Sequence, residues 1–276
     1  MLRLTALMDD KAAAHGRCEA EHGLSVFVEY GDKRILFDCG QSGLFLENAR
    51  ALSVDLDRLD AVVLSHSHYD HARGFRCLAE RGPVGSPLYT GPHFFEKKLA
   101  RKDGELRDLS AGFDRQFLED RGICHREIRG CQEIFPGVYL VSGFPRVYEF
   151  EKIPARFLRQ TPEGVVGDSF PDEVCMVLET EGGLAVLAGC AHPGILNMLT
   201  HIRQLLGKPI RAVFGGTHLM EAEEDRIVRT VDCLREMGLE ILGLSHCSGA
   251  FAGEKISRRK DVQGCWLAAG DTITLA

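Results

Sequence analysis

The chain has 276 residues, 45% of them hydrophobic, and a formal net charge of −7 at pH 7. A chain of this length can bury a substantial core, and we expect one large domain over residues 1–276. The acidic balance argues against nucleic acid as a partner, and no apolar run approaches the ~20 residues that a membrane-spanning helix needs.

The N-terminus and the cysteines both indicate a cytoplasmic protein. The first five residues are too short for a signal peptide, and the chain becomes acidic at Asp9 and Asp10. The ten cysteines are scattered, which in a large chain without a leader indicates reduced thiols. Cys124 and Cys131 stand seven apart, so pairing or metal binding is an alternative for them, but we expect two unpaired thiols.

The first part of the chain predicts strands that lead to a histidine-rich turn. Apolar runs bounded by turn residues indicate strands, and the Gly31-Asp32 turn joins two of them into a hairpin. The polar stretch at residues 9–22 is expected to be a loop. The expected strands cover residues 2–8, 24–30, 34–38, 61–64 and 87–90, and the expected helices cover residues 45–52 and 71–80.

Residues 92–170 are the least regular part, with one clear strand at residues 138–141. An irregular segment of this length is uncommon in a compact domain and is often functional. Its arginines could grip a phosphate or carboxylate, because a guanidinium offers a planar fork of donors; a solvated charged face is the alternative. These arginines are Arg101, Arg107, Arg115, Arg126, Arg129, Arg146, Arg156 and Arg159.

The second half repeats the layout of the first, although no sequence repeat is visible. A hairpin is followed by strand–helix units whose strands end close to histidine. Expected strands cover residues 174–180, 184–189, 210–214, 239–244 and 271–275, and amphipathic helices cover residues 195–206 and 221–237. This layout suits an α/β fold with two packed sheets and helices outside.

The most informative stretch is Leu-Ser-His-Ser-His-Tyr-Asp-His at residues 64–71, which directly follows an apolar run. His66 and His68 alternate, so they can point to one side of an extended segment, whereas Asp70 and His71 follow after the chain turns. Imidazole suits zinc and iron, and the carboxylate can hold a second cation. The alternative, polar-loop histidines without a metal, fits this dense spacing poorly.

H-x-H-x-D-H after a hydrophobic strand resembles the metallo-β-lactamase-fold superfamily. Further stretches resemble its dihydropterin-ribofuranosylaminobenzene phosphate synthase-like branch, which is related to methanopterin biosynthesis. They lie at residues 21–25, 36–40, 189–195, 215–219 and 245–249. The resemblance implies an αββα sandwich of two mixed sheets flanked by helices, with the insertion at about residues 92–170 covering the metals and selecting the substrate.

The resemblance also implies further site residues. Asp38, at a strand end, would orient metal-bound histidines through hydrogen bonds. Cys190 matches a ligand position by its strand end and His192 matches it by its chemistry, so either or both are candidates. His246 matches the final histidine of the superfamily. The histidine usual before residue 174 is missing, which leaves Asp168 and Asp172 as weak substitutes.

The remaining histidines are less specific. His218 is a candidate for a ligand, a proton donor or a substrate contact. His22 lies in a stretch that matches the family and is a candidate to reach the cavity. The others are expected at the surface; they are His15, His93, His125 and His201.

These residues predict a metal-dependent hydrolase with two divalent cations, zinc first and iron or manganese as alternatives. The proposed ligands are His66, His68, Asp70, His71, Cys190, His192 and His246. Asp70 and His218 are the catalytic candidates, acting with a metal-activated hydroxide on a small anionic substrate, phosphorylated or carboxylated. The alternatives are a pterin-related synthase that uses the metals as Lewis acids, a di-iron redox enzyme and a non-catalytic metal-binding module. Homo-oligomerisation is left open.

Overall fold

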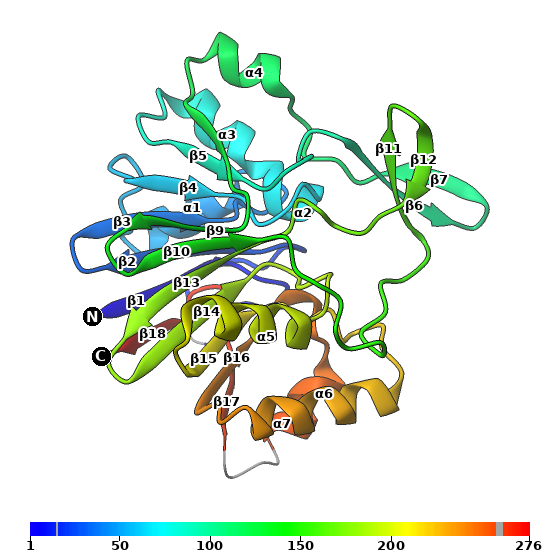
Figure 1. Ribbon diagram of the computed structural model, residues 1–276. Coiled ribbons are helices and arrows are strands. Elements are labelled where there is room, and N and C mark those ends of the chain that lie inside the picture. Colours follow the sequence, from blue (N-terminus) through cyan, green and yellow to red (C-terminus); the bar gives the residue numbers. More distant parts are fainter. Residues whose placement is uncertain (15, 258–261) are drawn as a thin grey trace.

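The computed structural model describes residues 1–14, 16–257 and 262–276. Two seven-stranded mixed sheets pack face to face, and helices cover the outer face of each sheet (Figure 1). The predicted αββα sandwich is confirmed. Among the described residues, no helix combines the length and apolar character needed to cross a membrane.

The first sheet has the order β18-β1-β2-β3-β4-β5-β8. Its strands are β1 (Leu2–Met8), β2 (Ser25–Tyr30), β3 (Lys33–Phe37), β4 (Ala61–Val63), β5 (Leu88–Thr90), β8 (His125–Glu127) and β18 (Thr272–Leu275). Pairing is antiparallel from β18 to β3 and parallel from β3 to β8. The parallel strands are joined through α1 (Leu44–Ala51), α2 (Tyr69–Ala72), α3 (Gly74–Arg81) and α4 (Arg115–Asp120).

The second sheet has the order β17-β16-β15-β14-β13-β10-β9 and the same division into antiparallel and parallel halves. Its strands are β9 (Cys131–Phe135), β10 (Val138–Ser142), β13 (Val174–Thr180), β14 (Gly183–Ala188), β15 (Ile210–Gly215), β16 (Ile241–Leu244) and β17 (Gln263–Trp266). Its helices are α5 (Ile195–Leu206), α6 (Glu224–Glu236), the 3-10 turn η1 (His246–Ser248) and α7 (Ala250–Ser257).

The core follows from the two-residue period of the strands. In β13, Val174, Met176 and Leu178 enter the cluster between the sheets, whereas Cys175 and Val177 enter the cluster under the helices. Both faces of this strand are buried, which is why its sequence reads as one continuous apolar run. The apolar positions of α5 pack on the same outer face.

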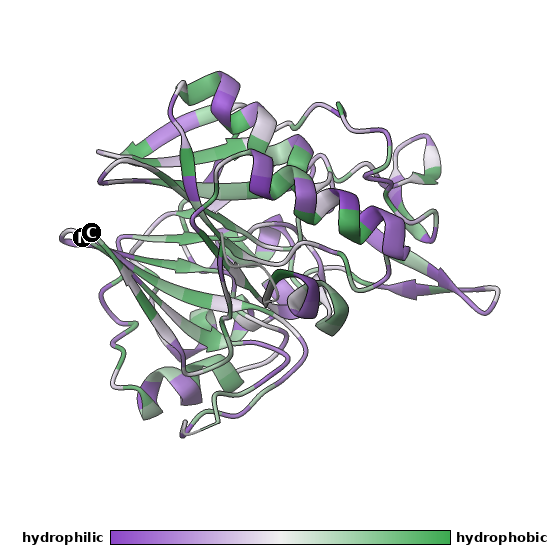
Figure 2. Cartoon of the chain, turned by 90° about the horizontal axis from the view of Figure 1, so that it is seen from below, coloured by the Kyte–Doolittle hydropathy of each residue, from purple (hydrophilic) through white to green (hydrophobic). Residues whose placement is uncertain are grey.

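The segment expected to be irregular contains a third sheet of four strands, so that expectation was wrong. Its order is β12-β11-β6-β7, with β6 (Lys97–Lys102), β7 (Glu105–Asp108), β11 (Phe157–Thr161) and β12 (Gly164–Gly167). It stands at one end of the sandwich (Figure 1). Its projecting β6–β7 hairpin is mostly hydrophilic (Figure 2). All of β7 is exposed, so the apolar alternation that usually marks a strand is absent.

The cysteines and the ends of the chain complete the fold. All ten cysteines are free thiols, including Cys124 and Cys131. Leu2 pairs with Leu275, so the first and last strands lie side by side at one edge of the first sheet. The sequence did not indicate α4, α7, β8, β9 or β17, all of which are short.

Candidate metal centre

The predicted site residues gather at one edge of the sandwich, where strands from both sheets end. Strands β4, β14, β15 and β16 each end shortly before a predicted residue, as expected for chemistry at the carboxyl edge of parallel strands. The residues brought together and buried there are His66, His68, Asp70, His71, Cys190, His192, His218 and His246. The two sheets lie close together here, as Gly189 shows: a Cβ atom added to it would lie only 2.1 Å from Ser65 Oγ.

Three imidazoles form the first cluster. One ring nitrogen from each of His66, His68 and His192 lies within 4.8 Å of the others. Their ring centroids are 4.7–4.9 Å apart, and the rings meet edge to face. Three converging nitrogens are the donor set of a tetrahedral metal position that keeps one place open.

A carboxylate and two imidazoles form the second cluster, beside the first. Ligand atoms of Asp70, His71 and His246 lie within 4.8 Å of one another, and His246 Nε2 is 3.2 Å from Asp70 Oδ2. Cys190 Sγ lies 3.1 Å from His71 Nε2 and also groups with His66. Cys190 is therefore placed between the two clusters, while His192 belongs to the first.

Asp38 links the histidine-rich loop to the end of β3. Its Oδ1 accepts a hydrogen bond from Ser65 N at 2.7 Å, and its Oδ2 accepts one from Ser65 Oγ at 2.7 Å. The same Oδ2 lies 2.7 Å from His71 Nδ1, which leaves His71 Nε2 directed at the centre. Ser65 Oγ also lies 2.9 Å from His66 Nδ1. This arrangement supports the orienting role predicted for Asp38.

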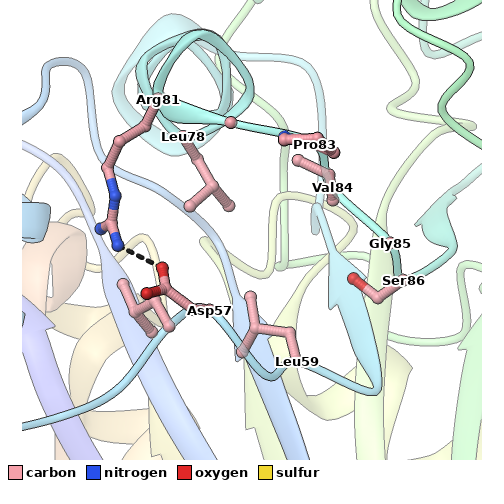
Figure 3. A pocket seen from close by; sticks show the side chains of 10 residues that line it. Asp57, Leu59, Leu78, Arg81, Pro83, Val84, Gly85 and Ser86 are labelled. Atoms are coloured by element: carbon pink, nitrogen blue, oxygen red, sulfur yellow. Dashed lines mark hydrogen bonds and ion pairs between the residues drawn. The ribbon is translucent and has the colours of Figure 1, made fainter.

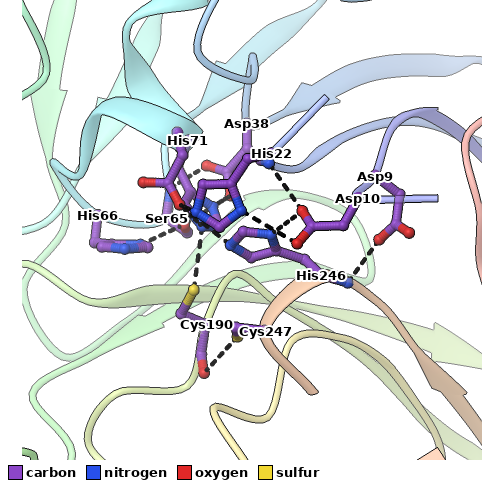
Figure 4. A network of polar contacts seen from close by, with 12 residues as sticks. Asp9, Asp10, His22, Asp38, Ser65, His66, His71, Cys190, His246 and Cys247 are labelled. Atoms are coloured by element: carbon purple, nitrogen blue, oxygen red, sulfur yellow. Dashed lines mark hydrogen bonds and ion pairs between the residues drawn. The ribbon is translucent and has the colours of Figure 1, made fainter. Parts of the chain in front are cut away.

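Sequence reasoning missed two aspartates at the end of β1. Asp10 Oδ1 lies 2.7 Å from His246 Nδ1, and its Oδ2 lies 3.1 Å from His22 Nδ1 (Figure 4). Asp9 Oδ1 accepts a hydrogen bond from His246 N at 2.6 Å. His22 reaches the centre, with Nε2 3.3 Å from Asp70 Oδ2. Asp9 and Asp10 lie in the predicted loop directly after β1, and this position after a strand was the signal that could have indicated them.

Cys247 was also missed. It is buried, and its Sγ lies 3.7 Å from the carbonyl oxygen of Cys190 (Figure 4). It groups with Cys190 and His246 as a further set of ligand atoms within 4.8 Å. A thiol next to the final histidine gave no spacing signal, because isolated cysteines are usually small buried side chains.

His218 lies beside the first cluster without joining it. Its ring centroid is 4.4 Å from that of His192 and 5.6 Å from that of Phe157. Among the described residues it belongs to no group of converging ligand atoms. Burial lowers the pKa of His218 to about 4, so the ring is neutral at pH 7. A substrate contact therefore fits its position better than a ligand role.

Asp168 and Asp172 do not supply a substitute ligand. Lys98 Nζ donates to Asp168 Oδ2 at 2.7 Å and to Asp172 Oδ1 at 2.6 Å. The other oxygen of Asp172 accepts hydrogen bonds from Ser67. Both aspartates are thus engaged by other side chains and belong to no group of converging ligand atoms among the described residues, whereas His192 does.

The other histidines lie outside the centre. His93 is exposed, and His125 and His201 are half-buried away from the clusters. His15 falls outside the described residues.

The first cluster fits a divalent cation. Burial lowers the pKa of His68 to about 3 and the pKa values of His66 and His192 well below the ordinary value. All three are therefore neutral at pH 7, which is the form that binds a metal. Among the described residues, His66 Nε2 and both nitrogens of His192 have no hydrogen-bond partner. Such buried polar atoms need a partner, and a cation would provide it.

The second cluster holds opposite charges. Burial opposes ionisation of Asp70, but hydrogen bonds from His22 and His246 outweigh it and hold the carboxyl pKa well below its ordinary value. Burial likewise opposes the charged form of His246, but its bonds to Asp10 and Asp70 raise its pKa well above the ordinary value. A cation bound there would take the place of the proton on His246.

The backbone at this edge is strained. Four residues without glycine's freedom adopt left-handed conformations: Asp38 (φ 57°), Ala191 (φ 55°), His218 (φ 49°) and His246 (φ 47°). Each directly follows, or nearly follows, the end of a strand. Such conformations gather at functional sites, where surrounding contacts hold them in place.

Two hollows have different relations to the centre. One of about 260 Å³ precedes β4 and β5 and is lined by Leu59, Leu78 and an Arg81–Asp57 ion pair (Figure 3). It lies at the amino ends of those strands, opposite the edge that carries the histidines. A groove of about 650 Å³ instead borders the centre at Tyr69, the neighbour of Asp70.

This groove, which we call the cationic groove, runs between the centre and the third sheet. Five cations and two acids are among its lining residues, which include Arg73, Arg101, Lys102, Arg107, Arg156, Asp108 and Glu221. Arg156 pairs with Glu221 at 2.7 Å. Within the described part of the chain, the structure shows no ion pair for Arg101 or Arg107. Three of the eight arginines singled out from the sequence therefore line the groove.

The chain's sequence and fold both match known proteins. The profile of the Metallo-beta-lactamase superfamily matches residues 19–219. The chain belongs to the metallo-β-lactamase superfamily. A superfamily relative, the 7,8-dihydropterin-6-methyl-4-(beta-D-ribofuranosyl)-aminobenzene-5'-phosphate synthase of Methanocaldococcus jannaschii, is 29% identical over 264 residues. The match covers 90% of this chain and 88% of the relative, so the predicted resemblance is confirmed.

Solved structures in the superfamily agree with this assignment. Tm1679, described as a metal-dependent hydrolase of the beta-lactamase superfamily, has a TM-score of 0.86 and 30% identity, with full coverage of both chains. A diphosphatase from the PhnP family has a TM-score of 0.55 and 15% identity over 100% of this chain and 98% of its own, which shows the fold alone. The full-length relatives of this metallo-β-lactamase-superfamily chain thus include both a protein described as a metal-dependent hydrolase and a synthase.

Proposed function

We propose that the chain is a hydrolase with a dinuclear metal centre that uses a metal-activated hydroxide on a small anionic substrate. The observation that carries the proposal is the pair of adjacent clusters, His66–His68–His192 and Asp70–His71–His246. Cys190, between the clusters, is proposed as a further ligand. Two cations held there would supply Lewis acidity and lower the pKa of a shared water toward ~7.

The chain's own residues would bind and orient. Asp38 and Asp10 hold the Nδ1 atoms of His71 and His246, which directs both Nε2 atoms toward Asp70 and Cys190, the other proposed ligands. Asp70 faces the same space and is proposed to orient the attacking water. His218 is neutral at pH 7 and lies at the edge of the first cluster, so we propose that it donates a hydrogen bond to the substrate.

Substrate charge is proposed from the cationic groove. Arg156 stacks 4.0 Å from the ring of Phe157, which in turn lies 5.4 Å from the ring of His68. Tyr69, which lines the groove and precedes Asp70, donates a hydrogen bond from its backbone N to Leu109 O at 2.8 Å. An anionic group in the groove would place the rest of a small molecule over the metal positions.

Replacing Arg101 or Arg107 by Ala is expected to raise KM for an anionic substrate about fivefold, since exposed charge pairs contribute up to ~1 kcal/mol each. The measurement is steady-state hydrolysis of bis(p-nitrophenyl) phosphate, compared with a neutral chromogenic lactone whose KM should not change. Arg129→Ala is the control, because Arg129 is 68% exposed and pairs with Glu127 away from the groove. Unchanged KM in both groove variants would remove the anionic-substrate proposal.

The proposed function is tested by metal content and activity together. Protein purified without oxygen is expected to hold two divalent metals per chain, and its visible absorption separates iron from zinc. It is expected to hydrolyse at least one class among chromogenic phosphodiesters, lactones and thioesters, and a chelator should abolish the reaction. A chain that binds no metal and hydrolyses none of these would contradict the proposal.

A second candidate, a pterin-related synthase, is favoured by the similarity to the Methanocaldococcus jannaschii synthase over 90% of this chain. The same centre would then act as a Lewis acid, and the cationic groove would hold a phosphate. Full metal content without hydrolysis of any substrate class, together with binding of a fluorescent dihydropterin, would favour the synthase over the hydrolase.

A further inference from the structure

Lys98 is a buried cation outside the two clusters. It lies in β6 of the third sheet, and its side chain is 1% exposed, whereas that of its neighbour Lys97 is 52% exposed. A buried ammonium needs partners, and Nζ finds them in Asp168 at 2.7 Å and Asp172 at 2.6 Å. It also lies 4.9 Å from the ring centroid of Phe170. The proposed centre makes no direct use of this charge.

The Lys98 contacts lead to the first cluster by one route through Asp172. The oxygen of Asp172 that does not meet Lys98 accepts hydrogen bonds from Ser67 N at 2.9 Å and Ser67 Oγ at 2.8 Å. Ser67 stands between His66 and His68, so these bonds fix the residue that sets the spacing of the two imidazoles. Because Lys98 binds Oδ1 of Asp172, it keeps Oδ2 turned toward Ser67, where it accepts both hydrogen bonds.

A second route leads through Phe170. Its ring is stacked on that of His192, with centroids 3.7 Å apart and planes 10° apart. Asp168 holds the loop that carries Phe170. Its Oδ1 accepts a hydrogen bond from Phe170 N at 2.7 Å, and its Oδ2 accepts one from Lys98 Nζ. All three imidazoles of the first cluster therefore have a support that leads back to Lys98.

We propose that Lys98 is a positioning residue for the first metal position, which it reaches through Asp172–Ser67 and through Asp168–Phe170. Because Lys98 belongs to β6, it also fastens the third sheet to the metal-binding loop. The inference rests on the proposed metal centre. Supports of bound histidines typically change metal affinity by about 10–100-fold when they are removed.

The test measures metal binding to Lys98→Met, which keeps an unbranched side chain and removes the charge. Metal-free protein is titrated with Zn²⁺ against a chromophoric chelator, and Co²⁺ absorption reports the ligand geometry. Wild-type protein is expected to bind two ions tightly. Lys98→Met is expected to bind one of them at least about tenfold more weakly, with a changed Co²⁺ spectrum. Lys97→Met, its exposed neighbour, should match the wild type in both measurements.

Circular dichroism of the metal-free variants shows whether they are folded. A folded Lys98→Met chain with wild-type affinities and spectrum overturns the inference. If Lys98→Met does not fold, Ser67→Ala decides, because it leaves the buried charges paired and removes one bond to Asp172. Weaker binding at one position supports the inference, and wild-type binding overturns it. Wild-type protein without Zn²⁺ affinity would overturn the metal centre as well, which distinguishes the two failures.

Discussion

His68→Ala is expected to lose one of the two proposed metals and to lower activity by about 10²–10³-fold, the size of effect seen when one electrostatic stabiliser of a transition state is removed. His68 is one of three imidazoles in the first cluster, and two nitrogens leave a cation underbound. The residue lies in the loop after β4 and belongs to none of the hydrophobic clusters. The fold should therefore persist.

Elemental analysis, hydrolysis rates and far-ultraviolet circular dichroism check this expectation together. His201→Ala is the matched control, because His201 is half-buried on α5 and makes its ring contact with Phe144, away from the clusters. Full metal content and activity in folded His68→Ala would refute the ligand assignment. A loss of metal in His201→Ala as well would indicate general instability rather than a lost ligand.

Asp38→Ala is expected to lower the free energy of unfolding by about 3–5 kcal/mol, as removal of one partner from a buried charged network does. Its carboxylate is fully buried and meets Ser65 N, Ser65 Oγ and His71 Nδ1. Removal leaves all of these groups without their partner in the interior. The left-handed backbone at Asp38 (φ 57°) adds to the cost, since alanine tolerates it less well than aspartate does.

Urea unfolding of metal-free protein measures the change, so that lost metal binding does not enter the result. Asp38→Asn is the companion variant: it retains the shape and the left-handed tolerance and should lose less stability than Asp38→Ala. A loss below ~1 kcal/mol in Asp38→Ala would show that water or neighbouring groups replace the carboxylate. Such a small loss would also argue against the proposal that Asp38 orients the His71 ring.

Much of the fold could be predicted because its two main sheets are simple in sequence. Strands such as β13 and β14 are buried on both faces, so they read as apolar runs, and the glycine turn between them reads as a hairpin. The site followed from the same logic. Residues that come directly after such runs, such as His66, Cys190 and His246, meet at one edge, because parallel strands all end there.

The third sheet could not be predicted, since its strands carry no apolar pattern. Lys98 looked like one more surface charge in Lys-Lys-Leu-Ala-Arg-Lys, and its burial depends on Asp168 and Asp172, about 70 residues further along. Asp10 depends in the same way on His246, a partner 236 residues away. Contacts between polar groups at such separations leave no periodic signal in one sequence.

The third imidazole shows a different limit. The histidine usual in the superfamily is missing before residue 174, and sequence reasoning looked for a substitute at the same place in the chain. The structure groups His66 and His68 with His192, which follows the end of β14 in the other sheet and was predicted separately as a candidate ligand. The sequence therefore named all three imidazoles, but only the fold shows that these three form one cluster.

The left-handed residues at the histidine edge bear on attempts to make this protein withstand heat. Glycine at Ala191 would relax the local backbone, yet it would also give more conformational freedom to the backbone next to His192. At this edge, a change that relieves backbone strain therefore also reduces the rigidity that metal binding needs. Efforts toward heat tolerance belong in hairpins that line neither the centre nor the cationic groove, such as the turn between β2 and β3.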